Sequence, residues 1–210
     1  MFIPRTARRG AIAPAALANI GLAAAIALAT GICTLASDAL GAQFVQRHPA
    51  RTCANAELSP TARDLALIRA ATLCLINRER AAHGERPLRA NVRLRRAAQL
   101  HTDSMVVHDY FEHDGPQGTT PLARLRAVGY ISSARVGYEV GENIAWGTRL
   151  QATPQAIVAA WMRSPGHRAN ILDPRYTETG IGVCAHPPSS LAHGQPGAIY
   201  TQDFGVIIGD

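Results

Sequence analysis

One histidine of this chain lies where imidazole chemistry is favoured, in the stretch 161–172, Trp-Met-Arg-Ser-Pro-Gly-His-Arg-Ala-Asn-Ile-Leu. Ser164 and Pro165 are typical of a helix start, because a serine side chain caps free N–H groups and proline lacks a donor where none is needed. His167 then falls in the first helical turn, where the helix dipole opposes a positive charge. We expect a neutral ring, which is the form that binds a metal or accepts a proton. The alternative is a packed, hydrogen-bonded histidine.

Two further residues carry groups that could take part in the same chemistry. His113 follows a predicted helix and two aromatic residues, where the chain turns toward a surface, and Glu142 lies among apolar neighbours. A carboxylate in apolar surroundings needs a partner, and a histidine or a metal ion would serve. Asn143 is expected to hold the Glu142 segment through main-chain bonds. Gln202 either lines the same site or packs at a sheet edge.

Helix and strand signals predict the elements that position these residues. Helices are expected from Ser59-Pro60 to Gly84, from Asn91 through Met105, from Thr120-Pro121 to Gly129 and from Thr153-Pro154 through Trp161. Segments 179–184 and 198–208 are rich in Ile, Val and Tyr and are expected to pair as antiparallel strands, with residues 141–146 as a third strand. The predicted class is α+β, with helices covering a small antiparallel sheet.

The N-terminal residues have the order of an export signal. Arg5, Arg8 and Arg9 precede an uncharged run from residue 10 to 37 that small residues close. We expect a signal peptide over residues 1–42, a lead-in segment over 43–60 and a single domain over 61–210. An uncleaved membrane anchor is the alternative for residues 1–42.

Charge and cysteine content limit the function classes. The chain has 21 basic residues, all of them arginine, and 15 acidic residues, spread without a basic patch interleaved with aromatics, so nucleic acid is not an expected partner. Export to an oxidising compartment favours a disulfide. A bridge between Cys53 and Cys74 would fix the lead-in to the first helix and leave Cys184 free, although other pairings remain open.

Seven ordered motifs resemble the bacterial branch of the CAP superfamily, which includes cysteine-rich secretory proteins, insect venom allergens and plant pathogenesis-related proteins. The matching segments span residues 64–207 and are Leu75-Ile-Asn-Arg-Glu-Arg80, Pro87-Leu88, Tyr110-Phe-x-His113, Gly141-Glu-Asn-Ile-Ala145, Trp161-Met-x-Ser-x-Gly-His-Arg-x-Asn-Ile-Leu172, Gly180-Ile-Gly-Val183 and Tyr200-Thr-Gln202. The resemblance implies a three-layer α-β-α sandwich.

The resemblance also implies a central cleft where His113, His167 and Glu142 converge. Many eukaryotic members add a second glutamate, which would fall near Ser164 or Pro165 here, and neither residue supplies a carboxylate. Two imidazoles remain as metal ligands, with Glu142 binding directly or through water. Such a set suits a weakly held divalent ion such as zinc.

Two functions are compatible with this cleft. The first is a secreted binding module of the extracellular space or cell envelope, whose partner the resemblance suggests to be a lipid, another small apolar ligand or an envelope component. The second is a metal-assisted hydrolase in which Glu142 activates a bound water. The chain lacks a serine nucleophile elbow and an HExxH helix, so the binding module is the preferred hypothesis. The other histidines, His101, His108, His186 and His193, are expected to be surface or packing residues.

Overall fold

The computed structural model describes residues 5–8 and 52–209. Its main helices are α1 (Leu65–Ala82), α2 (Val92–Val107), α3 (Pro121–Ala127), α4 (Pro154–Arg163), α5 (Pro165–Ile171) and the one-turn α6 (Ser189–Ala192). Its strands are β1 (Arg5–Arg8), β2 (Arg89–Ala90), β3 (Gly137–Thr148), β4 (Glu178–Cys184) and β5 (Gly197–Ile208). Short 3-10 helices, η1 (Pro116–Gly118) and η2 (Arg149–Ala152), precede α3 and α4.

The sheet has the strand order β1-β3-β5-β4-β2. β5 pairs antiparallel with both β3 and β4, as the strand pattern predicts, and β1 adds antiparallel to β3. The two-residue β2 pairs parallel with β4 and makes the sheet mixed. The expected α+β class is confirmed. β1 lies within the expected signal peptide, and the other residues of segment 1–42 lie outside the described part of the chain.

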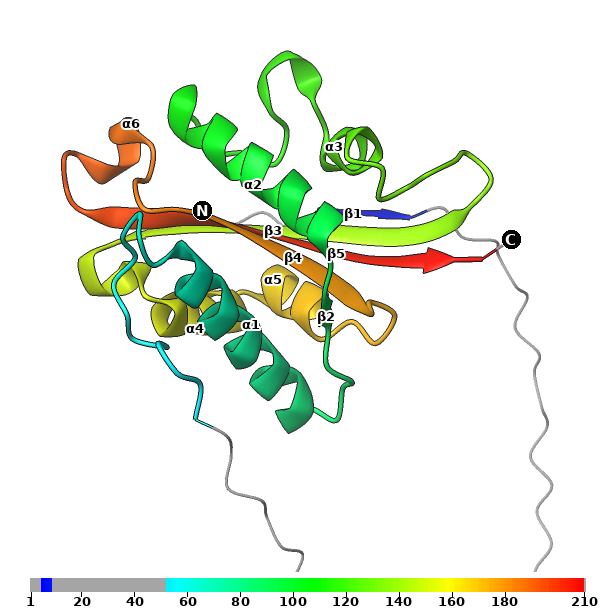
Figure 1. The fold of residues 1–210 in the computed structure, drawn as a ribbon, viewed down its shortest axis with the longest axis horizontal. Helices are drawn as coiled ribbons and strands as arrows, with labels where there is room; N and C mark the ends of the chain where they lie inside the picture. Colours follow the sequence, from blue (N-terminus) through cyan, green and yellow to red (C-terminus); the bar gives the residue numbers. More distant parts are fainter. Residues whose placement is uncertain (1–4, 9–51, 210) are drawn as a thin grey trace, which may run out of the picture. The chain divides into compact units, whose positions relative to one another are not determined.

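Helices cover both faces of the sheet, which gives three layers (Figure 1). α2 and α3 lie on one face, and α1, α4 and α5 lie on the other. The larger apolar cluster joins α1, α4 and α5 to the sheet, with fully buried members such as Ile68, Trp161 and Tyr200. A smaller cluster around Leu94 and Leu125 packs α2 and α3 against β3.

Two glycines of β4 let α2 approach the sheet. A Cβ built at Gly180 would lie 1.9 Å from the main-chain nitrogen of Arg95, and one at Gly182 would lie 2.5 Å from the carbonyl of Ala98. Both distances are shorter than any contact between real atoms, so the helix backbone occupies the place where a side chain would be. This close packing sets the depth at which α2 lies on the sheet.

The predicted helix starts are confirmed in most cases. Asn91, Thr120 and Thr153 each accept main-chain N–H groups as N-caps. Ser164 precedes α5 as predicted, but its side chain makes no capping hydrogen bond. The start of the first helix at Ser59 was wrong: residues 61–64 form a turn and α1 begins at Leu65.

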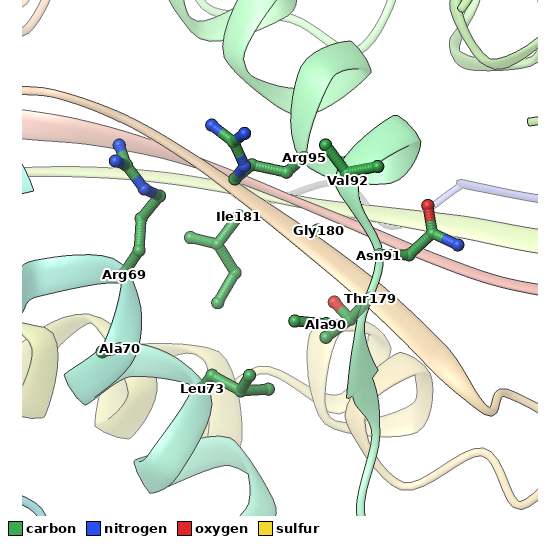
Figure 2. Close-up of a pocket in the computed structure, with 10 residues that line it drawn as sticks. All are labelled: Arg69, Ala70, Leu73, Ala90, Asn91, Val92, Arg95, Thr179, Gly180 and Ile181. Atoms are coloured by element: carbon green, nitrogen blue, oxygen red, sulfur yellow. The ribbon is translucent and has the colours of Figure 1, made fainter. Parts of the chain in front are cut away.

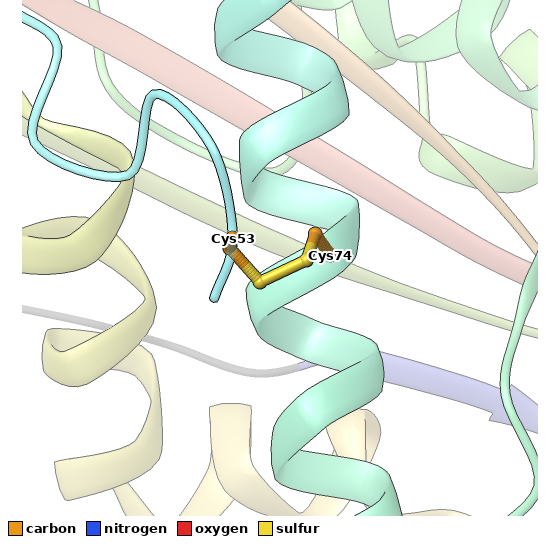
Figure 3. The surroundings of a disulfide bond; sticks show 2 residues. All are labelled: Cys53 and Cys74. Carbon is orange, nitrogen blue, oxygen red and sulfur yellow. A yellow bond between two sulfur atoms is a disulfide. The ribbon is translucent and has the colours of Figure 1, made fainter. Parts of the chain in front are cut away.

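The disulfide between Cys53 and Cys74 is present, as Figure 3 shows. It joins the lead-in to the middle of α1, with the two Cα atoms 5.7 Å apart. The remaining described cysteine, Cys184, is free. Within residues 5–8 and 52–209, no helix is both long and apolar enough to cross a membrane.

Candidate functional site

Glu142 is the centre of a buried polar network on β3. Its side chain is fully buried, with Oε2 2.6 Å from Nη2 of Arg124 on α3 and Oε1 2.7 Å from Nδ1 of His113. Burial alone would raise the pKa of Glu142, but the hydrogen bond from His113 and the charge of Arg124 lower it below its usual value. The carboxylate is therefore ionised and both of its oxygens are engaged.

Arg124 also holds the loop that carries His113. Its Nη2 donates to the carbonyl of His113 at 3.0 Å, and its Nη1 donates to the carbonyl of Thr119 at 2.9 Å. One guanidinium thus binds both the carboxylate of Glu142 and the main chain that positions His113. Charge-assisted bonds of this kind are stronger than neutral ones and fix the geometry.

His101 of α2 and Asp203 of β5 border the same network. Nε2 of His101 lies 3.0 Å from the carbonyl of Glu112 and 3.9 Å from Oε1 of Glu142. Burial lowers the pKa of His101 to about 4, so the ring is neutral near pH 7. Asp203 stands opposite Glu142 in the strand register, and burial together with the charge of Glu142 raises its pKa well above the usual value. Glu142 carries the negative charge of this carboxyl pair.

His167 lies on α5, on the opposite face of the sheet from the Glu142 side chain. Asn143 follows Glu142 along β3 and therefore faces the other side, where its Nδ2 donates to the carbonyl of His167 at 3.2 Å. Asn170 donates to the main-chain oxygen of Glu142 and to Oδ1 of Asn143. Burial lowers the pKa of the His167 imidazole to about 4, with the nearby His113 as a further cause. The expected neutral ring is supported, although burial is the main reason.

The structure brings some of the predicted site residues together and places Gln202 apart from them. The structure joins His113 directly to Glu142, and the Asn143 side chain links this strand to the main chain of His167. Gln202 lies opposite Asn143 in the register, fully buried, and its Nε2 donates to the hydroxyl of Thr179. This hydrogen bond joins two side chains of neighbouring strands within the sheet.

Three residues of the network were missed by sequence reasoning. Arg124 lies in the short helix α3, and only its place beside the buried Leu125 distinguishes it from other arginines. His101 was expected to be a surface or packing residue; it is buried, and its proximity to Glu142 was not foreseen. An acidic residue in the middle of an apolar strand was an available signal for Asp203.

The described residues do not form a closed metal site. Among the described residues, no group of three or more His, Cys, Asp and Glu side chains is arranged to hold a metal ion. Glu142 is already engaged by Arg124 and His113, so it is a poor first ligand. Of the ligands expected from the sequence, His113 and His167 are those of a type that suits zinc.

The three-layer fold and the His/Glu network define an α-β-α sandwich protein with a buried charged cluster on its sheet. A model of the Cysteine-rich secretory protein family, CAP, matches residues 73–204. The chain belongs to this family.

A bacterial protein shares much of this sequence. The uncharacterized protein YkwD of Bacillus subtilis (strain 168) is 35% identical over 131 residues, which make up 62% of this chain and 44% of YkwD. The chain thus spans less than half the length of that relative.

Solved structures show the same fold. An extracellular protein containing an SCP domain from Bacillus anthracis has 27% identity and a TM-score of 0.51, covering 69% of this chain and 43% of that chain. An outer surface protein from Borrelia burgdorferi shares the fold at 18% identity and a TM-score of 0.52, covering 72% of this chain and 96% of that chain.

Proposed function

We propose that this protein is an extracellular or cell-envelope binding module, and that the cleft of His113, Glu142 and His167 holds its ligand. The location is supported by relatives described as an extracellular protein and an outer surface protein. The expected signal peptide agrees with export.

The pairing of Glu142 with Arg124 and His113 is the observation that carries a binding function over hydrolysis. A general base must have a free lone pair that points at water or substrate. Both oxygens of Glu142 are instead held at 2.6 and 2.7 Å by protein donors, in a fully buried position. A carboxylate in this state orients His113 and does not abstract a proton.

The imidazoles of His113 and His167 would then make the ligand contacts. Glu142 accepts a hydrogen bond from Nδ1 of His113 and so fixes the orientation of this ring. A carboxylate on one ring nitrogen increases the basicity of the other, which favours metal binding. A divalent ion such as zinc, bound by two nitrogens with open positions for water or a further ligand, is the ligand to test first.

Calorimetry with zinc at pH 7.5 tests this proposal on the full chain. We expect weak binding by the unchanged protein and loss of most affinity in His113→Ala and in His167→Ala. His186→Ala, an exposed histidine in the loop after β4, is the matched control and should bind like the unchanged protein. Equal binding by the His113 and His167 variants, or none by the unchanged protein, would reject the metal.

Turnover assays separate binding from hydrolysis. The purified protein should not cleave casein, peptidoglycan or esters, with or without chelator. Chelator-sensitive turnover that disappears in Glu142→Gln would establish the hydrolase instead.

A further inference from the structure

A pocket of about 410 Å³ lies at the edge of β4, between α1 and α2 (Figure 2). This edge is opposite to β3 in the strand order, so the pocket is separate from the network of His113 and Glu142. β2 pairs only with Glu178 and Thr179, so from Gly180 onward β4 is paired with β5 on one edge and has no strand on the other. Pockets of about 300–1,000 Å³ are typical of small-ligand sites, so one or two amino-acid residues could be accommodated.

The open edge of β4 presents one free set of main-chain hydrogen-bonding groups, those of Ile181. The carbonyl of Thr179 accepts from the N–H of Asn91, and both main-chain groups of Val183 bond to the side-chain amide of Gln99. Main-chain groups alternate along a strand, so the N–H and C=O of Ile181 face the same edge. Among residues 52–209, nothing hydrogen-bonds to them there.

The N–H and C=O of Ile181, side by side on the open edge of β4, are complementary to one amide group of an extended chain. Gln99 already acts in this way at Val183, where its side-chain amide both donates and accepts, at 3.1 Å each. A ligand with an amide in the same orientation would satisfy Ile181, two residues earlier on the strand. Peptides that add to a sheet edge are recognised through such main-chain bonds.

Two arginines supply positive charge to the same pocket. Arg69 of α1 and Arg95 of α2 line it from either side, and Figure 2 shows both side chains at the same end. Burial lowers the pKa of Arg69, and the charge of Arg95 lowers it further. Neither forms an ion pair with a carboxylate in the described part of the chain. Two adjacent unneutralised guanidiniums favour an anion, and their planar donors suit a carboxylate.

The remaining wall of the pocket is apolar. Leu73 and Ala70 of α1, Ala90 and Val92 border it around Ile181. Figure 2 shows Leu73 and Ala90 at the end away from the guanidiniums. An apolar side chain of a ligand would be covered on this side.

We propose that this pocket binds the carboxyl-terminal residue of a peptide. Arg69 and Arg95 bind the terminal carboxylate, the main chain of Ile181 pairs with the last amide, and the apolar wall takes the last side chain. A fatty acid would use the arginines and the wall but leave Ile181 unpaired. The site does not depend on the function proposed for the histidine cleft.

Titration of the full chain with acetyl-Ala-Leu, followed by NMR and calorimetry, tests this proposal. We expect saturable binding that shifts the amide resonance of Ile181. The same dipeptide with a carboxamide terminus should bind at least tenfold more weakly, because the charge that the arginines recognise is gone. Decanoate should also bind more weakly and leave the Ile181 resonance in place. Equal binding of the carboxamide would refute the carboxylate contact, and equal binding of decanoate would refute the amide contact.

Variants assign the contacts and separate them from the histidine cleft. Arg69→Gln and Arg95→Gln should each weaken acetyl-Ala-Leu binding about tenfold, the loss expected for one charge-assisted bond. Arg93→Gln, an exposed arginine on α2 outside the pocket, is the matched control and should bind normally. His113→Ala should also bind normally, whatever the outcome of the zinc experiment. Unchanged binding in both pocket variants, or no binding by the unchanged protein, overturns the site.

Discussion

Arg124 and Glu142 form a buried ion pair in which each residue depends on the other. The guanidinium lies 2.6 Å from the carboxylate, and both side chains are buried. Removing one partner leaves an uncompensated charge, which typically costs about 3–5 kcal/mol, whereas removing both can be nearly neutral. The pair is therefore well suited to a double-mutant cycle.

We expect Arg124→Met to lower the free energy of unfolding by about 3 kcal/mol, because Glu142 then lacks its cation. Arg124→Met combined with Glu142→Gln should recover a substantial part of that loss. Urea unfolding followed by circular dichroism measures both. Additive losses in the double variant would mean that the two residues contribute independently. Arg126→Met, on the exposed side of the same helix, is the control.

His101 should make the stability of the fold depend on pH. Its pKa is about 4 in the folded protein, against a usual value near 6.5, so the unfolded chain takes up a proton before the folded chain does. Stability is then present above pH 6.5 and falls as the pH drops toward 4, by up to about 3 kcal/mol. Glu142, with its lowered pKa, acts in the same direction below its unfolded value, and Asp203, with its raised pKa, acts in the opposite direction.

Thermal unfolding between pH 7 and pH 4 checks this prediction. His101→Gln keeps a polar side chain but cannot be protonated in this range, so its midpoint should fall less than that of the unchanged protein. If the unfolding midpoints of the variant and the unchanged protein fell equally with pH, the pH dependence would belong to other groups.

At the scale of elements, the packing of α2 on β4 depends on Gly180. A methyl group there would meet the main chain of α2, which cannot move without displacing the whole helix. We expect Gly180→Ala to lower the free energy of unfolding by about 3 kcal/mol or more through overpacking. Gly209→Ala, with nothing within 4 Å of the added group, is the matched control. Denaturant unfolding measures both variants. Equal stability of the two would show that α2 can shift to accommodate the added methyl group at little cost.

At the scale of the whole molecule, the disulfide joins the lead-in to the domain. Cys53 and Cys74 are separated by 21 residues, and a loop of this size is stabilised by about 3 kcal/mol in the chain-entropy model. Cys53→Ser with Cys74→Ser should lose about that amount in urea unfolding, with Cys184→Ser as the control. Peptide mapping should find the first two cysteines joined and Cys184 alkylated after denaturation. An unchanged midpoint in the double variant would show that the bridge adds no stability.

The sequence determined the features that are encoded locally. Caps at Asn91, Thr120 and Thr153 mark helix starts because side-chain oxygens bond N–H groups only two or three residues away. The Ile, Val and Tyr content of segments 179–184 and 198–208 likewise predicted β4 and β5 and their antiparallel pairing, and the ordered motifs placed the chain in its family. These signals span few residues, so they can be read before the fold is known.

Only the tertiary structure decided which charges meet. The apolar neighbours of Glu142 in the sequence indicated that its carboxylate needs a partner. They did not identify Arg124, which lies 18 residues away on another element. Asp203 faces Glu142 only through the register of β3 on β5, and the open edge at Ile181 exists only because β2 ends at Ala90. Ion pairs and pockets depend on how elements pack across the whole chain, and sequence spacing does not carry that information.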